Sequence, residues 1–385
     1  MAAKLACILF LSFCVARGER KLTQGTNSEV SHELLQEAKA HAQGNLSRAI
    51  SSIEATFFSN ESSVSDYGNS SCPNIVVIPN VCQSRPDGVQ ASDMATAFPF
   101  SVRNLTTDGL NLFYREAGTV NAPVVLLLHG FPSSSHQFRN LIPILATRYR
   151  VLAPDLPGFG FTVVPKQRAY MYTFANLATT VESFLDALHV ESFALYLFDF
   201  GAPTGMRIAL RRPNNITALI AQNGNVYTEG FGAHFWAPIM KYWRSGSQAD
   251  REALIPLVFS LDATRSQYTT GSPMPWTIAP EAYDTDWYLL SNITDQLYQL
   301  DLFYDYRTNV DLYPEFQQFL REYKPPLLIA WGKNDIIFPA SGAEAFKRDI
   351  PDAEIHLLDA GHFALETNLR DIGLLMMAFL KRRGI

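Results

Sequence analysis

The chain has 385 residues, of which 47% are hydrophobic and 18% charged, and its formal net charge is -6 at pH 7. This length is ample for a domain of roughly 250–300 residues with an additional segment, and the apolar content is typical of a globular protein with a large core. The negative charge and the lack of a long basic run argue against nucleic acid as a partner.

The first residues have the pattern of an export signal. Lys4 gives the N-terminal region a positive charge. An apolar run follows over 5–15, and residues 16–18 have the small-x-small pattern of a cleavage site. We therefore expect 1–18 to be a signal peptide and the protein to be secreted or to reside in the lumen of the secretory pathway. The apolar run is too short for a membrane span, and no later run of about 20 apolar residues predicts one. An uncleaved anchor is the alternative to a cleaved signal.

Residues 19–95 form an extension ahead of the core, with helix-compatible spacing over 30–58 and a Ser- and Asn-rich stretch after it. Cys72 and Cys82 are the two cysteines left after signal removal. Such an isolated, closely spaced pair predicts a disulfide, and free thiols or a metal half-site are less favoured because no histidine lies near. Six sequons predict a glycoprotein, at Asn45, Asn60, Asn69, Asn104, Asn215 and Asn292.

The rest of the chain alternates apolar strands with helical segments. Strands are predicted over 110–116, 124–129, 150–154, 193–198, 218–222, 327–331 and 354–358, with helical stretches such as 172–188 between them. This alternation predicts an α/β protein with a mostly parallel sheet covered on both faces. It stops over 224–321, where many aromatic residues indicate short helices and loops. We expect a core over 96–223 and 322–385, with 224–321 inserted.

Three acid and base residues lie at strand ends. Asp199 follows the strand over 193–198 in a sharp turn that leads into a helix, where a serine would imply acyl transfer. A carboxylate in its place suits attack on a saturated carbon, which leaves an alkyl ester for later hydrolysis. Asp335 and His362 follow two later strands. Each alone is ordinarily a turn, surface or satisfied core residue, but the order nucleophile, acid, histidine favours a catalytic set.

Five motifs resemble the epoxide hydrolase and haloalkane dehalogenase branch of the α/β-hydrolases. They are His129-Gly-Phe-Pro, Asp155-Leu-Pro-Gly-Phe-Gly, Asp199-Phe-Gly-Ala-Pro, Trp331-Gly-Lys-Asn-Asp and Gly361-His-Phe-Ala-Leu-Glu. The resemblance runs from about Phe98 to the C-terminus. It implies an α/β-hydrolase fold with a helical cap over 224–321, an oxyanion hole made by the backbone N–H groups of Phe131 and Phe200, and no metal or organic cofactor.

The two reactions of this branch need different groups beside the nucleophile. A leaving halide needs N–H donors, and the dehalogenases place a tryptophan directly after the nucleophile and a second tryptophan or asparagine elsewhere. Phe200 and Phe131 occupy the corresponding positions, so halide donors could come only from the cap, for example from Trp236 or Trp243. An epoxide oxygen instead needs a proton from a weak acid such as tyrosine, whose pKa is about 10.

Epoxide hydrolases supply two tyrosines from the cap, and two tyrosines here are candidates for them. The cap contains other tyrosines that could serve instead, at Tyr227, Tyr268, Tyr283, Tyr288, Tyr298 and Tyr304. Tyr306 lies in Asp305-Tyr-Arg-Thr-Asn, which resembles the second tyrosine motif, and Tyr242 is the candidate for the first. We therefore expect a hydrolase that opens a small apolar epoxide through an ester on Asp199. A haloalkane dehalogenase with the same triad, another small-molecule α/β-hydrolase and a non-catalytic secreted adhesion or receptor module are alternatives, and the intact triad argues against the last.

Overall fold

The computed structural model describes residues 100–385. The signal peptide, the extension, the disulfide expected between Cys72 and Cys82 and the sequons at Asn45, Asn60 and Asn69 lie outside the described residues and stay predictions. Of the other sequons, Asn104 and Asn292 are exposed and Asn215 is half-buried. Glycosylation at these three positions is also still a prediction.

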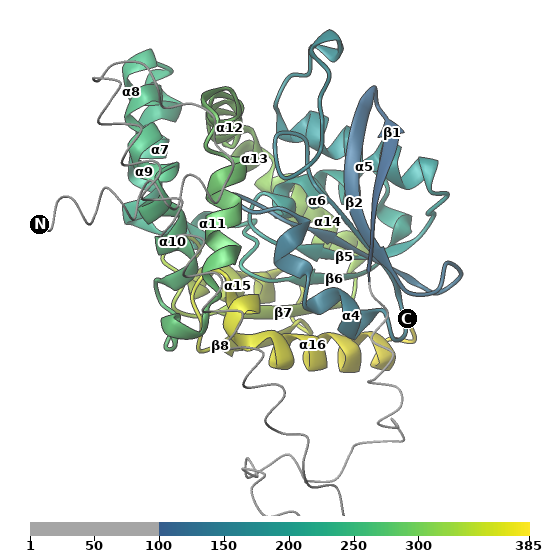
Figure 1. Cartoon of the computed structure of the whole chain (residues 1–385). Coiled ribbons are helices and arrows are strands. Elements are labelled where there is room, and N and C mark those ends of the chain that lie inside the picture. Colours follow the sequence, from purple (N-terminus) through teal and green to yellow (C-terminus); the bar gives the residue numbers. More distant parts are fainter. Residues whose placement is uncertain (1–99) are drawn as a thin grey trace, which may run out of the picture. The chain divides into compact units, whose positions relative to one another are not determined.

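An eight-stranded sheet runs through the described region (Figure 1). Its strands are β1 (Ser101–Thr107), β2 (Leu110–Ala117), β3 (Val124–Leu128), β4 (Arg150–Pro154), β5 (Phe193–Leu197), β6 (Ile216–Ala221), β7 (Leu327–Gly332) and β8 (Glu354–Leu358). They lie in the order β1-β2-β4-β3-β5-β6-β7-β8. β2 is antiparallel to β1 and β4, and the other neighbouring pairs are parallel.

All seven strands that the sequence predicts are present, each within two residues of its expected ends. The sequence did not predict β1, because five of its seven residues are exposed and the strand has no apolar alternation. Among residues 100–385 it lies at the edge of the sheet and pairs only with β2. The parallel strands β3, β5 and β7 are buried on both faces and therefore have continuous apolar sequences.

Two apolar cores lie on opposite faces of the sheet, because successive side chains of a strand alternate between its faces. In β3, Leu126 and Leu128 belong to one core, and Val125 and Leu127 belong to the other. The first core is covered by α5 (Phe174–Ala187), α6 (Gly201–Arg211) and α14 (Tyr313–Tyr323), and the second by α4 (Leu141–Leu145) and α16 (Ala364–Arg382) (Figure 1).

A helical insertion separates β6 from β7, at the position where the sequence predicts the cap. Its helices are α7 (Ala233–Ser245), α8 (Gln248–Ala253), α9 (Ile255–Val258), α10 (Leu261–Thr269), α11 (Pro280–Leu289), α12 (Ile293–Asp305) and α13 (Arg307–Asp311), followed by α14. The Ser260 hydroxyl accepts a hydrogen bond from the backbone N–H of Ala263 and so caps α10. Among residues 100–385, no helix has both the length and the apolar content that crossing a membrane requires.

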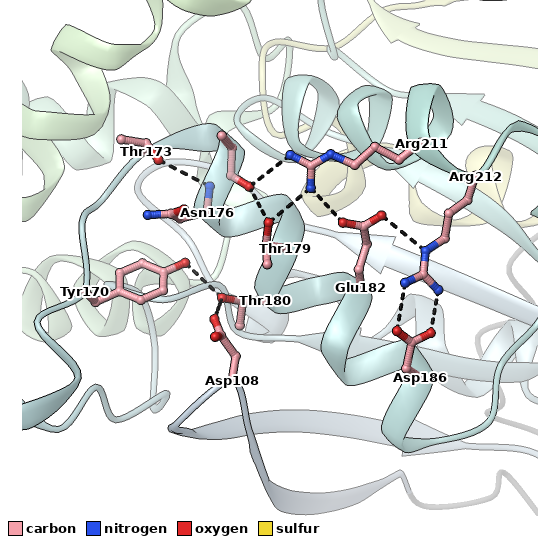
Figure 2. Close-up of polar contacts among 11 residues, drawn as sticks. Asp108, Tyr170, Thr173, Asn176, Thr179, Thr180, Glu182, Asp186, Arg211 and Arg212 are labelled. Carbon is pink, nitrogen blue, oxygen red and sulfur yellow. Dashed lines mark hydrogen bonds and ion pairs between the residues drawn. The ribbon is translucent and has the colours of Figure 1, made fainter.

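Ion pairs fix α6 against α5, as Figure 2 shows. Glu182 of α5 accepts hydrogen bonds from Arg211 at 2.7 Å and from Arg212 at 3.2 Å, and Arg212 also binds Asp186 through both of its terminal nitrogens. Each partly exposed pair contributes only about 0–1 kcal/mol, so their main effect is on geometry. They hold in place a helix whose N-terminus begins beside the candidate site.

Candidate active site

Asp199 occupies the turn between β5 and α6, as the sequence predicts for a strand–turn–helix segment. Its φ is 43°, in the left-handed region where aspartate is one of the few side chains found with any frequency. Gly201 begins α6 directly below, and a Cβ on it would lie 2.4 Å from the carbonyl oxygen of Leu128. Only glycine lets the helix pass this close to β3, so Gly201 permits the turn that presents the Asp199 carboxylate.

The Asp199 carboxylate binds the two backbone amides predicted to form an oxyanion hole. The N–H of Phe131 donates to its Oδ1 at 2.6 Å, and the N–H of Phe200 also stabilises the carboxylate. Gly130 must lack a side chain, because a Cβ there would lie 2.3 Å from the same Oδ1. If water attacks an ester at this carboxyl group, the Phe131 amide is placed to stabilise the oxyanion that forms on Oδ1, and the Phe200 amide stabilises the same carboxyl group.

Asp335 holds His362 in one orientation. Nδ1 of His362 lies 2.7 Å from Oδ2 of Asp335, so this nitrogen carries a proton and donates a hydrogen bond to the carboxylate. The Nε2 atom of His362 lies 3.8 Å from Oδ2 of Asp199 and is buried without a hydrogen-bond partner among the described residues. The structure thus brings Asp199, Asp335 and His362 together, with a basic nitrogen left for a water molecule.

Asn223 also takes part in the site, although the sequence analysis did not select it. It follows β6 with a φ of 49°, and its Nδ2 donates to Oδ2 of Asp335 at 2.8 Å. The backbone N–H of Ile337 donates to Oδ1 of Asp335 at 2.7 Å, so both carboxylate oxygens are held. The sequence contains a signal for this residue, because the polar pair Gln222 and Asn223 directly follows an apolar strand. In open α/β sheets, polar residues at strand ends often belong to the site.

Burial and neighbouring charges together set the pKa values of Asp199 and His362. Desolvation raises the pKa of Asp199 to about 6, although the charge of His362 and the two amide N–H groups oppose the rise. Burial disfavours the charged form of His362, but the charge of the Asp335 carboxylate, the hydrogen bond that His362 donates to it and the charge of Asp199 outweigh this, and the pKa of His362 is raised. The two residues therefore stabilise each other's charged forms.

Tyr306 lies against the nucleophile turn. It is completely buried at the junction of α12 and α13, and its ring centre is 5.7 Å from that of Phe200, the residue after Asp199. Burial raises the pKa of Tyr306 well above its usual value, and Tyr313 and the Asp199 charge raise it further. Its hydroxyl lies 3.5 Å from the Tyr313 hydroxyl. At neutral pH this phenol is protonated and can donate a proton or a hydrogen bond.

Tyr242 is not brought to the triad. Its hydroxyl accepts a hydrogen bond from Nη1 of Arg251 at 3.1 Å, and its ring packs on Tyr304 with the ring centres 4.7 Å apart. Arg251 in turn binds Asp301 at 2.7 Å. Proximity to Asp199 was expected from the sequence, but in the structure the contacts of Tyr242 join α7, α8 and α12 within the insertion.

Trp236 and Trp243, the two cap tryptophans considered as halide donors, line the aromatic wall around Tyr306. Their ring centres lie 4.7 Å and 6.0 Å from that of Tyr306. The indole N–H of Trp236 donates to the carbonyl of Ile337 at 3.0 Å, and that of Trp243 donates to the carbonyl of Phe303 at 2.6 Å. Both donors are therefore already used by backbone acceptors, and neither is free to bind a halide.

The histidine and aspartate motifs that precede the nucleophile hold the loop of Phe131 in place. His129 is fully buried, and burial lowers its pKa to about 4, so it is neutral. Its Nδ1 donates to the Gly130 carbonyl at 3.1 Å, and its Nε2 accepts from the N–H of Leu156 at 2.9 Å. Asp155 caps the loop from the other side by accepting from the backbone N–H of Ser135 at 2.7 Å. These residues position the site, and they contact the loop rather than Asp199.

Comparisons with known proteins identify the family of the chain. The model of the alpha/beta hydrolase fold family matches residues 123–369. A hydrolase of Saccharomyces cerevisiae, described as uncharacterised, is 46% identical over 265 residues, which are 68% of this chain and 90% of the yeast protein. A haloalkane dehalogenase of Psychrobacter cryohalolentis is 36% identical over 140 residues, 36% of this chain and 45% of that protein.

The fold is also found in solved structures. The epoxide hydrolase VrEH1 from Vigna radiata superimposes with a TM-score of 0.60 at 23% identity, over 74% of this chain and 98% of that one. This structural similarity shows the fold alone. The family model and the sequence relatives show that the chain belongs to a family of hydrolases. The chain is a hydrolase that belongs to the alpha/beta hydrolase fold family, in the branch that contains epoxide hydrolases and haloalkane dehalogenases.

Proposed function

We propose that this protein hydrolyses a small apolar epoxide to a diol through a covalent ester on Asp199. The observation that carries the proposal is the placement of Tyr306. It is a buried, protonated phenol beside the nucleophile turn, while the indole N–H groups of the same wall, those of Trp236 and Trp243, are bound to backbone carbonyls. The wall offers an acid for an alkoxide and no free indole donor for a halide.

In the first half-reaction Asp199 attacks a ring carbon of the epoxide. A carbon–oxygen bond to Asp199 forms, the ring carbon–oxygen bond breaks, and the proton of Tyr306 moves to the departing oxygen. A phenol suits this step because it is a stronger acid than an alcohol and remains protonated until the alkoxide develops. The buried phenyl rings of Phe131 and Phe200 exclude water from the reacting atoms, which strengthens the hydrogen bonds made there.

In the second half-reaction His362 takes a proton from water through Nε2, and the water oxygen attacks the carboxyl carbon of Asp199. The amides of Phe131 and Phe200 stabilise the oxyanion. When it collapses, the ester bond breaks, the diol oxygen takes the proton from His362, and the proton of the resulting Asp199 carboxyl group returns to Tyr306. Overall, one epoxide and one water give one diol.

Ester formation itself prepares His362 for the second step. The charge of Asp199 is one of the groups that raise the pKa of His362. An ester at Asp199 is uncharged, so the pKa of His362 falls once the ester forms. The imidazole is then more often neutral, which is the form that a general base requires.

The direct test is to incubate the protein with a panel of small epoxides and, separately, with bromoalkanes of matching size, and to measure diol and bromide. The proposal expects diol from at least one epoxide and slower bromide release from the corresponding bromoalkane. Bromide release that exceeds diol formation would favour dehalogenation. If the protein converts neither epoxides nor bromoalkanes and hydrolyses carboxylic esters instead, it is another small-molecule hydrolase.

A further inference from the structure

A small cavity adjoins the acid–base side of the triad. Its volume is about 100 Å³, and its wall includes Asp335 and His362 together with residues of α10 and of the loop after β7. Asp199 is not part of this wall. The cavity therefore reaches the residue that activates water and does not border the carboxylate that attacks the substrate.

The size and lining of the cavity suit water. Sites for small organic ligands usually occupy about 300–1,000 Å³, whereas a water molecule takes about 30 Å³ of liquid volume. Ser266, Gln267 and Thr270 contribute polar groups to the wall, and the hydroxyls of Ser266 and Thr270 lie 3.0 Å apart. Gln267 is almost completely buried, and its side chain makes no hydrogen bond with another described residue. A few ordered waters could bind these groups.

The cavity also reaches the surface. Leu257 and Ile336 both line it, and they are 54% and 52% exposed. At its inner end is His362, whose buried Nε2 has no partner among residues 100–385. Aromatic rings pack against the turn that carries Asp199, and the region of Phe200 and Tyr306 is called the aromatic side below.

We propose that this cavity supplies the water that hydrolyses the Asp199 ester, while the substrate occupies the aromatic side. The inference rests on the proposed two-step function, and the step concerned is the second. Water from the cavity gives a proton to Nε2 of His362, its oxygen bonds to the carboxyl carbon of Asp199, and the ester bond to the diol breaks. Filling the cavity should slow this step and leave the first step unchanged.

The test uses Ala263→Leu, which adds a larger apolar side chain to the cavity wall from α10. Ala253→Leu is the matched control, because it makes the same change on α8 at an exposed position that does not line the cavity. Gln267→Met is a second variant that keeps the side-chain volume and removes the amide. Rapid-quench mass spectrometry with styrene oxide would follow ester formation and ester decay separately in each protein.

We expect Ala263→Leu to slow ester decay about tenfold or more, with ester formation within about twofold of wild type and the ester accumulating. Gln267→Met should slow decay in the same direction, and Ala253→Leu should leave both steps unchanged. Slower ester formation in Ala263→Leu, or unchanged decay in both cavity variants, would overturn the inference and leave the ester mechanism standing. If the wild type forms no ester with any epoxide, the proposed function itself fails.

Discussion

Nε2 of His362 lies 3.8 Å from Oδ2 of Asp199, which is too far for a hydrogen bond and close enough for a water molecule to reach both residues. This spacing separates the base from the nucleophile. In a serine-type triad the histidine must take the proton of the nucleophile, whereas an ionised aspartate has no proton to give. In the proposed mechanism His362 is therefore needed for water activation and dispensable for the initial attack.

The first prediction follows from this separation. His362→Gln should still form the Asp199 ester but should not hydrolyse it, so the substrate mass should remain on the peptide that contains Asp199. Mass spectrometry of the digested protein after incubation with an epoxide gives the measurement. Asp199→Asn is the control, since it should carry no adduct. An unmodified peptide in His362→Gln, with diol still formed, would mean that water attacks the epoxide directly.

A second prediction distinguishes the two candidate tyrosines. Tyr306→Phe removes only a hydroxyl, and losing a hydrogen bond to a developing charge in a dry site costs about 2.7–4 kcal/mol, or roughly a hundred- to thousand-fold in rate. The loss should appear in ester formation, measured in a single turnover. Tyr242→Phe should change this rate by no more than about twofold. The Tyr242 hydroxyl is hydrogen-bonded to Arg251 and the ring packs on Tyr304, so the lost hydroxyl is one that binds within the insertion. Equal losses in both variants would place Tyr242 at the substrate after all.

The pH dependence of ester formation is a third prediction. Asp199 must be ionised to attack, and its pKa is about 6, so the single-turnover rate should fall as the pH drops through about 6. The charge of His362 is the largest influence that lowers this pKa. In His362→Gln the fall should therefore begin at a higher pH than in the wild type. A fall that stays at the same pH in the variant would show that His362 does not stabilise the carboxylate.

A fourth prediction concerns Asp286, a buried carboxyl group on α11 that is hydrogen-bonded by the Tyr268 hydroxyl. Desolvation raises its pKa from 3.8 to about 8, although Tyr268, Ser133 and Arg139 oppose the rise and the charge of Glu366 adds to it. Between these pH values the folded protein binds a proton that the unfolded chain has lost. The free energy of unfolding therefore falls as the pH rises through this range.

Asp286→Asn keeps an acceptor for Tyr268 and cannot ionise, so its stability should depend less on pH between about 5 and 8. At the upper end the variant should exceed the wild type by at least about 1 kcal/mol in the free energy of unfolding, given that one pKa unit corresponds to about 1.4 kcal/mol. Denaturant titrations at several pH values measure this. Asp284→Asn, at an exposed position of the same helix, is the control. Parallel curves for all three proteins would contradict the prediction.

The fifth prediction is export. In a eukaryotic host the protein should appear in the medium, begin near Glu19 and lose mass on treatment with a glycosidase. The pattern of 1–18 and the six sequons support this expectation, and Asn104 and Asn292 are exposed in the folded region. N-terminal sequencing and gel mobility provide the measurements. An unglycosylated protein retained in the cytosol would rule it out.

The sequence by itself determined the fold class and the triad, because both depend on local signals that tertiary structure does not alter. Continuous apolar runs predict buried parallel strands, and the polar residue that ends such a run lies at the carboxyl edge of the sheet, where the ends of neighbouring strands meet. Asp199 and Asp335 follow strands of this kind, and His362 follows the neighbouring parallel strand β8, so the sheet brings the three residues to one edge. The strand β1 was missed because an exposed edge strand has no such run.

Only the tertiary structure decided which groups of the insertion face the triad. Short helices joined by loops have no sheet to fix their relative positions, so the sequence could name Tyr306, from its motif, and Tyr242, from its spacing, only as candidates. Packing separates them: Tyr306 contacts Phe200, whereas Tyr242 binds Arg251 within the insertion. The support that Asn223 gives to Asp335 and the cavity beside His362 likewise come from segments distant in the chain, and their contacts exist only in the folded molecule.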